Sequence, residues 1–253
     1  MRRFSVALLF LAVAATAGAD WSILSATSEP GRAGILHRHV VLENSSAGAR
    51  AIVDLATFSS KSCTLQVVQN EDGTRNLAEA MTHAKCLAGV NGGYFDPDFA
   101  PIGLLIADGK MIAPLRRARL LTGVLAASPR GVRIMRPGEF SRNAKPNAAV
   151  QCGPFLVDLG KGVLGLDDSR SARRTFAATG LNDQVALGFC SDTSLAELAT
   201  ILATTRLAGD FKIQRALNLD GGSSSAFWFA RASGEFSIPE QKSVRDFVAI
   251  VPR

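Results

Sequence analysis

Apolar residues alternate with polar ones, or gather in short β-branched runs, along most of this chain. Runs of this kind, bounded by Gly, Pro, Asn or Asp, are typical of β-strands. The predicted strands span residues 34–42, 50–58, 63–69, 87–90, 103–107, 120–126, 131–135, 149–157, 175–179, 185–189, 216–219, 226–230 and 247–251. Asp108 and Gly109 separate two of the apolar runs and predict a tight hairpin, because glycine takes a positive φ angle at no steric cost.

Two segments have the apolar spacing of amphipathic helices, residues 74–85 and residues 194–207. Ser194 and Glu197 fit a capping box, and Asp192 just before them suits the positive end of a helix. Each predicted helix precedes a strand that carries polar candidate residues. We therefore predict an α+β fold in a single domain, with a strand-dominated mixed sheet as its core and a few helices packed on it.

The N-terminus has the pattern of a secretory signal peptide. Arg2 and Arg3 precede an apolar stretch over residues 6–15, and small residues follow at positions 17–19. The apolar stretch is too short to span a bilayer comfortably. We expect cleavage after Ala19, a mature domain over residues 20–253, no membrane span, and a secreted or periplasmic location.

The charge of the chain gives only a weak indication of its partners. It contains 28 Lys and Arg against 22 Asp and Glu, a net charge of +6. The densest basic groups, residues 116–119 and 170–174, are not interleaved with aromatic residues, so we expect no nucleic-acid partner. The excess supports a slight attraction for phosphate esters or anionic polymers of the cell envelope. The oligomeric state is not indicated.

The four cysteines are Cys63, Cys86, Cys152 and Cys190. An even number in an oxidising compartment favours two disulfides, and three pairings exist. We expect Cys63–Cys86 and Cys152–Cys190, since each pair joins strand-like segments that are close in order; free buried thiols are the alternative. No Cys-x-x-Cys spacing and no cluster of histidines occurs, so a zinc or redox site is not predicted.

One polar segment lies between two apolar runs: Asn218-Leu219-Asp220-Gly221-Gly222-Ser223-Ser224-Ser225. A simple turn needs only one Asp-Gly pair. Two glycines and three serines instead surround one carboxylate with successive N–H groups and hydroxyls, which suits an oxyanion or a sugar. The alternative is a tight hairpin with a polar tip, in which Asp220 caps its own turn.

Three other segments also place polar side chains next to apolar runs. They are Val90-Asn91-Gly92-Gly93-Tyr94-Phe95-Asp96, Gln151-Cys152-Gly153-Pro154 and Arg173-Arg174-Thr175. Taken in order with the Asp-Gly-Gly segment, they make the chain resemble the phosphodiester glycosidase family from about residue 52 to residue 251. The resemblance implies hydrolysis of a glycosyl phosphodiester, in a sugar phosphate or an envelope glycan. It also implies roles for Asn91, Arg174, Thr175 and Asp220.

The chemistry of such a reaction fits these residue types. The leaving phosphate monoester is a weak base, so one carboxylate together with cations and N–H donors could suffice. Asp220 is the expected acid/base or nucleophile, Arg174 the phosphate clamp, and Asn91 the polar group beside them. The expected substrate contacts are Gly92, Gly93, Tyr94, Gln151, Thr175, Asp192, Asn218, Gly221, Gly222, Ser223 and Ser224. Backbone N–H groups of the two glycine pairs are expected to complete an anion nest.

Alternatives remain for these candidates. Arg174 could pair with a surface carboxylate, and Asn91 and Asn218 could be turn formers. Gln151 lies in an otherwise apolar run, so its amide must find partners, with the ligand as one candidate. A second carboxylate could come from Asp192, or otherwise from Asp96.

The sequence departs from the family pattern where it has Cys190-Ser191-Asp192 in place of a frequent Asp-Gly pair, and at Cys152. No Gly-x-Ser-x-Gly elbow supports a serine hydrolase. Calcium bound by Asp220, Asp96 and carbonyls is conceivable, but no EF-hand loop supports it, so no cofactor is expected. The rival functions are a carbohydrate-binding module without turnover and a structural envelope protein.

Overall fold

The computed structural model describes residues 21–209 and 211–253, so the predicted signal peptide and its cleavage after Ala19 lie outside the described residues. Strands make up most of the ordered elements, with two α-helices, α1 (Leu77–His83) and α2 (Leu195–Thr204), in this part of the chain. The strands are β1 (Trp21–Pro30), β2 (Leu36–Asn44), β3 (Ala49–Ser59), β4 (Cys63–Gln69), β5 (Ala88–Asn91), β6 (Leu105–Ala107), β7 (Lys110–Ala113), β8 (Gly123–Ser128), β9 (Gly131–Met135), β10 (Ala148–Cys152), β11 (Phe155–Asp158), β12 (Lys161–Gly162), β13 (Ala172–Gly180), β14 (Gln184–Thr193), β15 (Ile213–Asn218), β16 (Phe227–Arg231), β17 (Gly234–Ile238) and β18 (Asp246–Pro252). The strand-dominated α+β class predicted from the sequence is confirmed.

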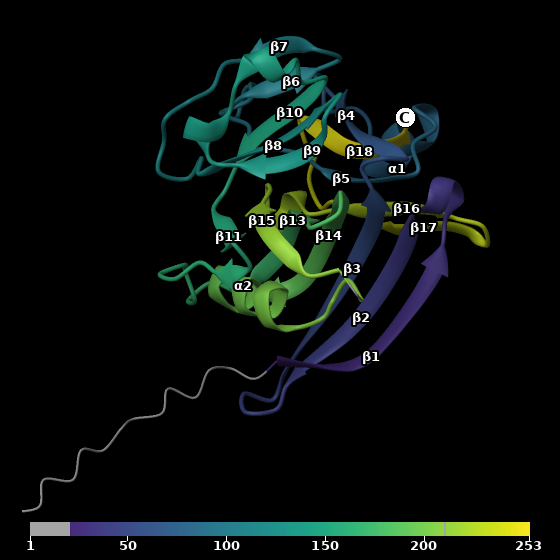
Figure 1. Ribbon diagram of the computed structural model, residues 1–253, viewed down its shortest axis with the longest axis vertical. Helices are drawn as coiled ribbons and strands as arrows, with labels where there is room; N and C mark the ends of the chain where they lie inside the picture. The colour runs from purple at the N-terminus through teal and green to yellow at the C-terminus, as the bar shows by residue number, and fades with distance from the viewer. Residues whose placement is uncertain (1–20, 210) are drawn as a thin grey trace, which may run out of the picture.

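Within the described residues the strands form three sheets. The first has the order β1-β2-β3-β14-β13-β15-β11-β12, the second β7-β6-β10-β8-β9, and the third β17-β16-β5-β18-β4. In Figure 1 the second sheet lies above the first, and the third runs between them on the side of α1. Every strand pair of this part of the chain is antiparallel, so the strands do not make the one mixed sheet that the sequence predicted.

The three sheets enclose a common hydrophobic core. Residues from all three contribute to it, with the fully buried rings of Phe155, Phe227 and Phe229 among the largest side chains. Helix α2 packs on the other face of the first sheet, and α1 packs on the other face of the third. The core therefore fixes the first and third sheets relative to each other where their polar segments meet.

Local sequence signals account for the helix starts and for one hairpin. Ser194 caps α2 in a capping box with Glu197, as predicted, and Asn76 caps α1 in the same way with Glu79. Asp108 and Gly109 have φ angles of 50° and 75°, which are those of a hairpin turn between β6 and β7. The sequence predicted the Ser194 capping box and the hairpin because both depend only on neighbouring residues; the Asn76 capping box is equally local but was not predicted.

Three strands were missed, one of them the two-residue β12, which pairs with β11. Strand β1 is exposed at nearly every position, so its apolar residues show no alternation, and β17 is an exposed partner of β16. Both are held by pairing with a neighbouring strand rather than by burial of one face. Strand β14 is also longer than predicted and includes Asp192 near its end.

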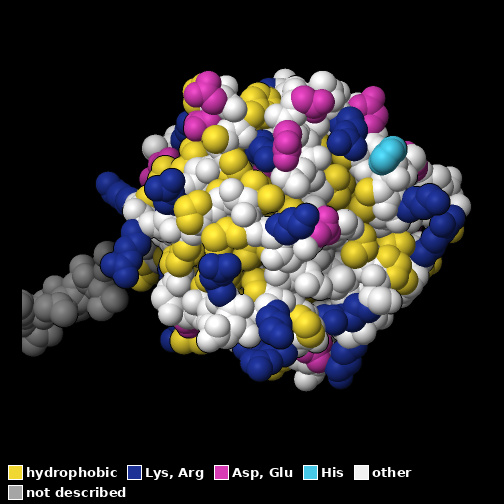
Figure 2. All heavy atoms as spheres, turned by 90° about the horizontal axis from the view of Figure 1, so that it is seen from above, with side chains coloured by type: hydrophobic (Ala, Val, Ile, Leu, Met, Phe, Trp, Pro, Cys, Tyr) yellow, Lys and Arg dark blue, Asp and Glu magenta, His cyan; other side chains and the backbone are white. Residues whose placement is uncertain are grey.

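The surface is consistent with the scattered charge seen in the sequence. On the face shown in Figure 2, Lys and Arg side chains stand apart, with neutral and apolar groups between them. No helix of the described residues is long and apolar enough to cross a membrane.

The expected disulfides are not formed. All four cysteines are free, buried thiols within the described residues. Cys63 and Cys152 belong to the common core, whereas Cys86 packs under α1 and Cys190 packs under α2. Each expected pair is thus divided between two packing regions, and the sequence proximity of the strands misled the prediction.

Alkylation of the thiols tests this arrangement. Burial raises the pKa of Cys86 to about 11 and that of Cys190 to about 12, and it also raises the pKa values of Cys63 and Cys152, so few thiolates exist at neutral pH. With iodoacetamide and no reductant, we expect no adducts on the folded protein and adducts on all four cysteines in denaturant, read by mass spectrometry. Fewer adducts in denaturant would show that disulfides are present.

Candidate active site

The buried side chain of Asn91, at the end of β5, connects three of the four sequence motifs. Its Nδ2 donates to the carbonyl oxygen of Asp220 at 2.8 Å. Its Oδ1 accepts from Thr175 Oγ1 at 2.7 Å and from the N–H of Ala226 at 3.0 Å. Asn91 therefore joins the third sheet to β13 of the first sheet and to the turn after β15, and all its strong hydrogen-bonding atoms are used within the protein.

Asp220 lies at the start of this turn with its carboxylate partly exposed. Its Oδ1 accepts from the N–H of Gly221 at 3.0 Å. Burial raises the pKa of Asp220, and the nearby Ser224 hydroxyl, the Lys242 ammonium and the Gly221 N–H oppose that rise only in part. A carboxyl group with a raised pKa is suited to exchange protons closer to neutral pH.

Arg174 is a buried cation beside the turn. Its Nε donates to the Thr193 carbonyl at 3.0 Å, and its Nη2 donates to the Arg170 carbonyl at 2.6 Å. Nη1 lies 3.8 Å from the position that a Cβ atom would occupy at Gly221, and it has no protein acceptor within the described residues. Two carbonyls thus fix the guanidinium while one amino group stays available to an anion near Asp220. The expected alternative of a surface ion pair is not formed in the described part of the chain.

Lys242 is a second cation that sequence reasoning missed. It is exposed, its ammonium lies 5.2 Å from the centre of the Phe95 ring, and its charge lowers the pKa of Asp220. The segment that carries it is anchored to the serine turn, since the N–H of Gln241 donates to the Ser223 carbonyl at 2.7 Å. No motif surrounds Lys242 in the sequence, so only the folded chain reveals its place.

The Gln-Cys-Gly-Pro motif contributes through its backbone. Asn218 Nδ2 donates to the Gly153 carbonyl at 3.0 Å and to Tyr94 Oη at 3.3 Å, and Tyr94 Oη donates to the same Gly153 carbonyl. All four motifs therefore meet around Asp220.

Several polar atoms at this place have no partner. Asn218 Oδ1, Ser224 Oγ and Ser225 Oγ are buried and make no hydrogen bond of normal geometry within the described residues. Buried polar atoms are nearly always hydrogen-bonded, so a cluster without partners indicates a position for bound water or for ligand. Ser223, by contrast, is exposed at the tip of the turn.

Three of the four N–H groups of the expected anion nest are used within the protein, and only the N–H of Gly222 has no acceptor among the described residues. The N–H of Gly92 donates to the Asp246 carbonyl at 2.9 Å, and that of Gly93 donates to Asp246 Oδ1 at 3.2 Å. The N–H of Gly221 is used by Asp220 itself. A Cβ atom at position 92 would lie 1.8 Å from Asp246 Oδ1, so glycine is required there for close packing rather than for substrate contact.

Asp246 is the second carboxylate near Asp220, and it too was missed. It is 2% exposed at the start of β18. Burial raises its pKa to about 6, and the negative charge of Asp220 adds to the rise, while the N–H of Gly93 and Arg245 oppose it. A signal existed in the sequence, since Arg245 and Asp246 interrupt an otherwise apolar run at residues 244–251.

Three candidates are engaged elsewhere. Gln151 Oε1 accepts from the N–H groups of Leu104 and Arg116, both at 3.0 Å, and its Nε2 donates to the Arg116 carbonyl at 2.7 Å; this amide holds a loop and leaves little for a ligand. Asp96 accepts from backbone N–H groups of its own turn. Asp192 is exposed, and its charge acts on Arg173 rather than on Asp220.

The donor atoms do not assemble a metal centre. No group of three His, Cys, Asp or Glu side chains in the described ranges is arranged to hold a metal ion. Asp96 and Asp220, the two carboxylates considered for calcium, each accept hydrogen bonds from backbone N–H groups of their own turns.

The protein thus combines three antiparallel sheets with a half-buried carboxylate held between polar turns. The family model of the phosphodiester glycosidases matches residues 84–251, so the chain belongs to the phosphodiester glycosidase family. Among curated proteins, none matches the chain by sequence.

Two solved structures share the fold. One is the catalytic domain of zebrafish N-acetylglucosamine-1-phosphodiester alpha-N-acetylglucosaminidase, auto-inhibited by its pro-peptide. It matches with a TM-score of 0.60 at 15% identity, over 92% of this chain and 83% of that one. The other is a hypothetical protein from Synechocystis, with a TM-score of 0.59 at 16% identity, over 87% of this chain and 62% of that one. Both likenesses show the fold alone.

Replacing Asn91 tests its role as a framework residue. Asn91→Ala leaves the Thr175 hydroxyl, the Ala226 N–H and the Asp220 carbonyl without their partner, each a buried group. We expect the free energy of unfolding to fall by on the order of 3–5 kcal/mol, measured by chemical denaturation. Asn143→Ala, at an exposed position, should change it by less than about 0.5 kcal/mol. Equal stability of the two variants would contradict the framework role.

The raised pKa of Asp246 predicts a pH dependence of stability. Between its ordinary value of 3.8 and the folded value of about 6, the folded protein keeps a proton that the unfolded chain has released. Protonation of Asp246 therefore stabilises the folded protein at low pH, and this stabilisation is lost as the pH rises from about 4 through 6. Asp246→Asn removes the loss, so its stability relative to the unmodified protein should increase by up to roughly 3 kcal/mol between pH 4 and pH 7. Denaturation curves over this range measure the difference, and a difference that does not vary with pH would contradict the raised pKa.

Proposed function

We propose that this protein is a secreted or periplasmic hydrolase that cleaves a glycosyl phosphodiester, of the kind found in sugar-1-phosphate diesters and envelope glycans. Membership of the phosphodiester glycosidase family supports hydrolysis of such a bond. The N-terminal pattern of Arg2 and Arg3 followed by an apolar stretch supports export.

The observation that carries the proposal is the combination of groups around Asp220. A half-buried carboxylate lies near two cations that make no ion pair within the described residues, Arg174 and Lys242. In the same segment, the side-chain oxygens of Asn218, Ser224 and Ser225 are buried and have no hydrogen-bond partner within the described residues. A purely structural turn would have satisfied these atoms within the protein.

Each group has a role suited to its contacts. Asp220 is the reacting carboxylate, because its raised pKa favours proton transfer or attack near neutral pH. Arg174 presents one amino group from a fixed guanidinium, and Lys242 offers a mobile ammonium; together they stabilise the charge of the departing phosphate. The hydroxyls of Ser224 and Ser225 and the amide oxygen of Asn218 contact sugar hydroxyls.

The remaining motif residues hold this arrangement in place. Asn91 and Thr175 fix the turn, and Gly92 and Gly93 pack on Asp246. Asp246 lies in the buried layer beneath the glycines, and the negative charge of Asp220 favours the protonated form of Asp246 through repulsion.

Hydrolysis of an α-N-acetylglucosaminyl phosphodiester tests the proposal. The purified mature protein should release the phosphate monoester, and Asp220→Asn should lower kcat/KM by at least about a hundredfold, because it removes the reacting carboxylate. Reaction in heavy-oxygen water should place the label on the sugar, as cleavage of the glycosidic C–O bond requires.

The control is Asp108→Asn, at the exposed hairpin turn between β6 and β7, where asparagine is equally suited to the positive φ angle. It should retain full activity. Equal rates for Asp220→Asn and the unmodified protein would exclude Asp220 as the reacting group. Absence of turnover together with binding of the same diester would favour the rival binding function.

A further inference from the structure

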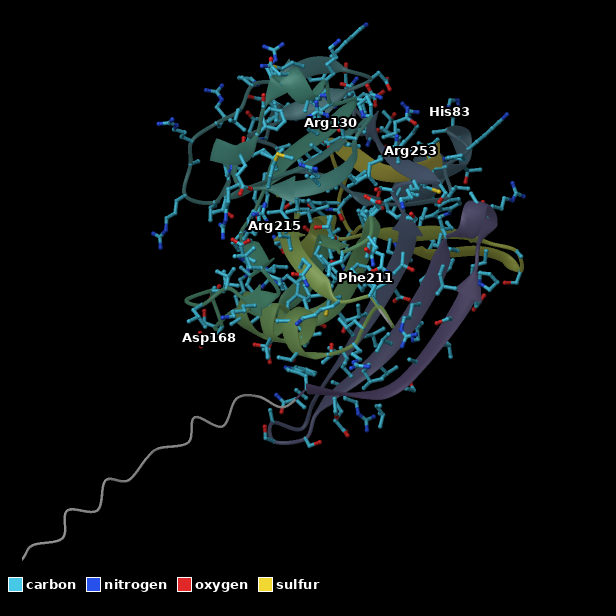
Figure 3. The ribbon with its side chains drawn as sticks, in the orientation of Figure 1. His83, Arg130, Asp168, Phe211, Arg215 and Arg253 are labelled. Carbon is cyan, nitrogen blue, oxygen red and sulfur yellow. The ribbon has the colours of Figure 1, made fainter. Side chains whose placement is uncertain are left out.

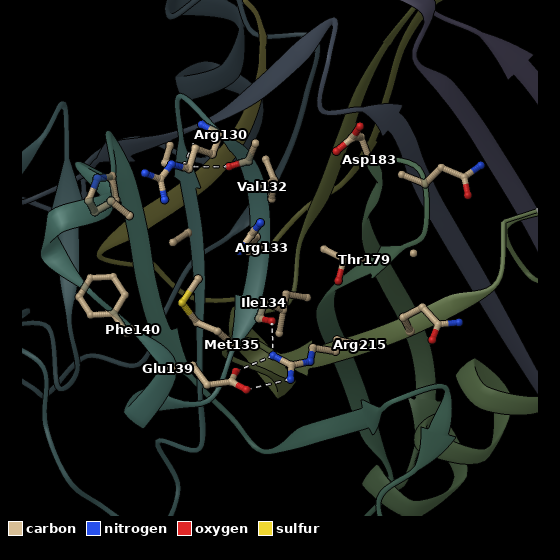
Figure 4. A pocket seen from close by; sticks show the side chains of 18 of the residues that line it. Arg130, Val132, Arg133, Ile134, Met135, Glu139, Phe140, Thr179, Asp183 and Arg215 are labelled. Atoms are coloured by element: carbon tan, nitrogen blue, oxygen red, sulfur yellow. Dashed lines mark hydrogen bonds and ion pairs between the residues drawn. The ribbon is translucent and has the colours of Figure 1, made fainter.

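A groove with a cavity volume of about 770 Å³ lies away from Asp220. One wall is β9 with the segment that follows it, which includes Phe140, and the other is the β13–β14 turn with the start of β15. Figure 4 shows β9 with Arg133, Phe140 on the neighbouring segment, and Thr179 and Arg215 across the groove. The volume is in the range of roughly 300–1,000 Å³ that small-molecule sites occupy.

The groove and the candidate active site lie at opposite ends of the same two strands. On β13, Arg174 and Thr175 belong to the active-site end and Thr179 to the groove. On β15, Asn218 belongs to the active-site end, whereas Gln214 and Arg215 line the groove. At about 3.3 Å per residue, roughly 15 Å of strand separates the two places, so a single short ligand does not occupy both.

The groove carries positive charge that the protein does not neutralise. Arg215 is held by Glu139 in a two-fold contact, at 2.6 and 3.0 Å, and Asp183 faces Lys61 at 3.6 Å. Arg130 and Arg133 are exposed, and within the described residues neither side chain makes a hydrogen bond or an ion pair. In Figure 3, Arg130 lies above Arg215, and Arg253 lies to the right of both. The uncompensated arginines favour an anionic ligand.

Neutral polar and apolar groups complete the lining. The side chains of Thr179, Asn182, Gln184 and Gln214 make no hydrogen bonds within the part of the chain described, so their donors and acceptors are available. Phe140 and the exposed Leu181 supply apolar surface beside them. Amides and hydroxyls next to apolar faces suit a saccharide, whose hydroxyls and C–H faces alternate.

An extended peptide fits this groove less well. A peptide that paired with the free edge of β9 would need the outward carbonyl groups of that strand. The outward carbonyl of Ile134 already accepts from Arg215 Nη1 at 3.0 Å, and the contact with Glu139 fixes that guanidinium. Arg215 therefore occupies the position that a pairing strand would take.

We propose that this groove is an accessory binding site for an anionic oligosaccharide, held by Arg130 and Arg133 at its charged groups and by Phe140 and the four polar side chains along its sugars. The inference builds on the proposed function, because a glycosyl phosphodiester polymer would supply ligand to both places. The accessory site would keep such a polymer bound while the active site acts on another unit.

Calorimetric titration of the mature Asp220→Asn protein with a phosphodiester-linked disaccharide tests the site without turnover. We expect two binding equivalents for this protein. Adding Arg130→Gln and Arg133→Gln should remove one equivalent or weaken it at least about tenfold. Adding Arg32→Gln and Arg206→Gln, which removes the same charge at exposed positions outside the groove, should leave both equivalents unchanged.

Two further ligands give the outcomes that would overturn the proposal. A neutral disaccharide of the same sugars should bind the groove at least about tenfold more weakly, and an acidic peptide should not bind there. Unchanged binding in the Arg130 and Arg133 variant, equal binding of the neutral sugar, or binding of the peptide that depends on these arginines would each refute it. If the active site does not bind the disaccharide, the Asp220→Asn protein should bind one equivalent instead of two. Loss of this equivalent on adding Arg130→Gln and Arg133→Gln would still identify the groove as the binding site.

Discussion

The hydrogen bonds of one buried amide, Asn91, hold the candidate active site together. This side chain ends β5 in the third sheet and reaches Thr175 in the first sheet, the Asp220 carbonyl and the Ala226 N–H. A buried amide has to satisfy its donors and its acceptor, and leaving one such group unpaired costs about 1–3 kcal/mol. The position of Asp220 therefore depends on the relative placement of two sheets, which the common hydrophobic core between them fixes.

The position of Asn91 explains why the residues that follow it in the chain are glycines. With Asn91 in place, Gly92 and Gly93 lie against Asp246, at a distance that no side chain at position 92 could tolerate. The carboxyl groups of Asp220 and Asp246 are thereby brought near each other where burial limits their solvation, and the pKa values of both rise. Their mutual repulsion is a cost to stability, and Lys242 offsets part of it at Asp220. Such costs are characteristic of functional sites.

The sequence predicted the parts of this site that belong to local motifs. The Asp-Gly-Gly turn, the Asn-Gly-Gly pair and Arg174 could be found because a turn and its polar residues are neighbours in the chain. Asp246 and Lys242 could not be found in this way. Asp246 reaches the site through the pairing of β18 with β5, in which Phe247 lies opposite Asn91. Lys242 reaches it because the neighbouring Gln241 N–H donates to the Ser223 carbonyl of the turn. The same limit applies to the fold. Alternation predicted strands, but their division into three antiparallel sheets depends on contacts between distant segments, as does the separation of Cys152 from Cys190.

Whether the hydrogen-bonding atoms of a polar side chain have partners within the protein distinguishes framework residues from candidate ligand-binding residues better than residue type does. Asn91 and Gln151 are both buried amides in motifs of the family, and the protein itself saturates both. Asn218, of the same chemistry, keeps a buried oxygen without a partner, and Arg174 keeps a free amino group although two carbonyls fix it. The same distinction operates at the far end of β13 and β15, where Arg215 is saturated by Glu139 and the Ile134 carbonyl while Arg133 is free. Along these strands, side chains whose donors and acceptors are all used maintain the shape of the protein, and those beside them keep polar atoms that have no partner in the described residues.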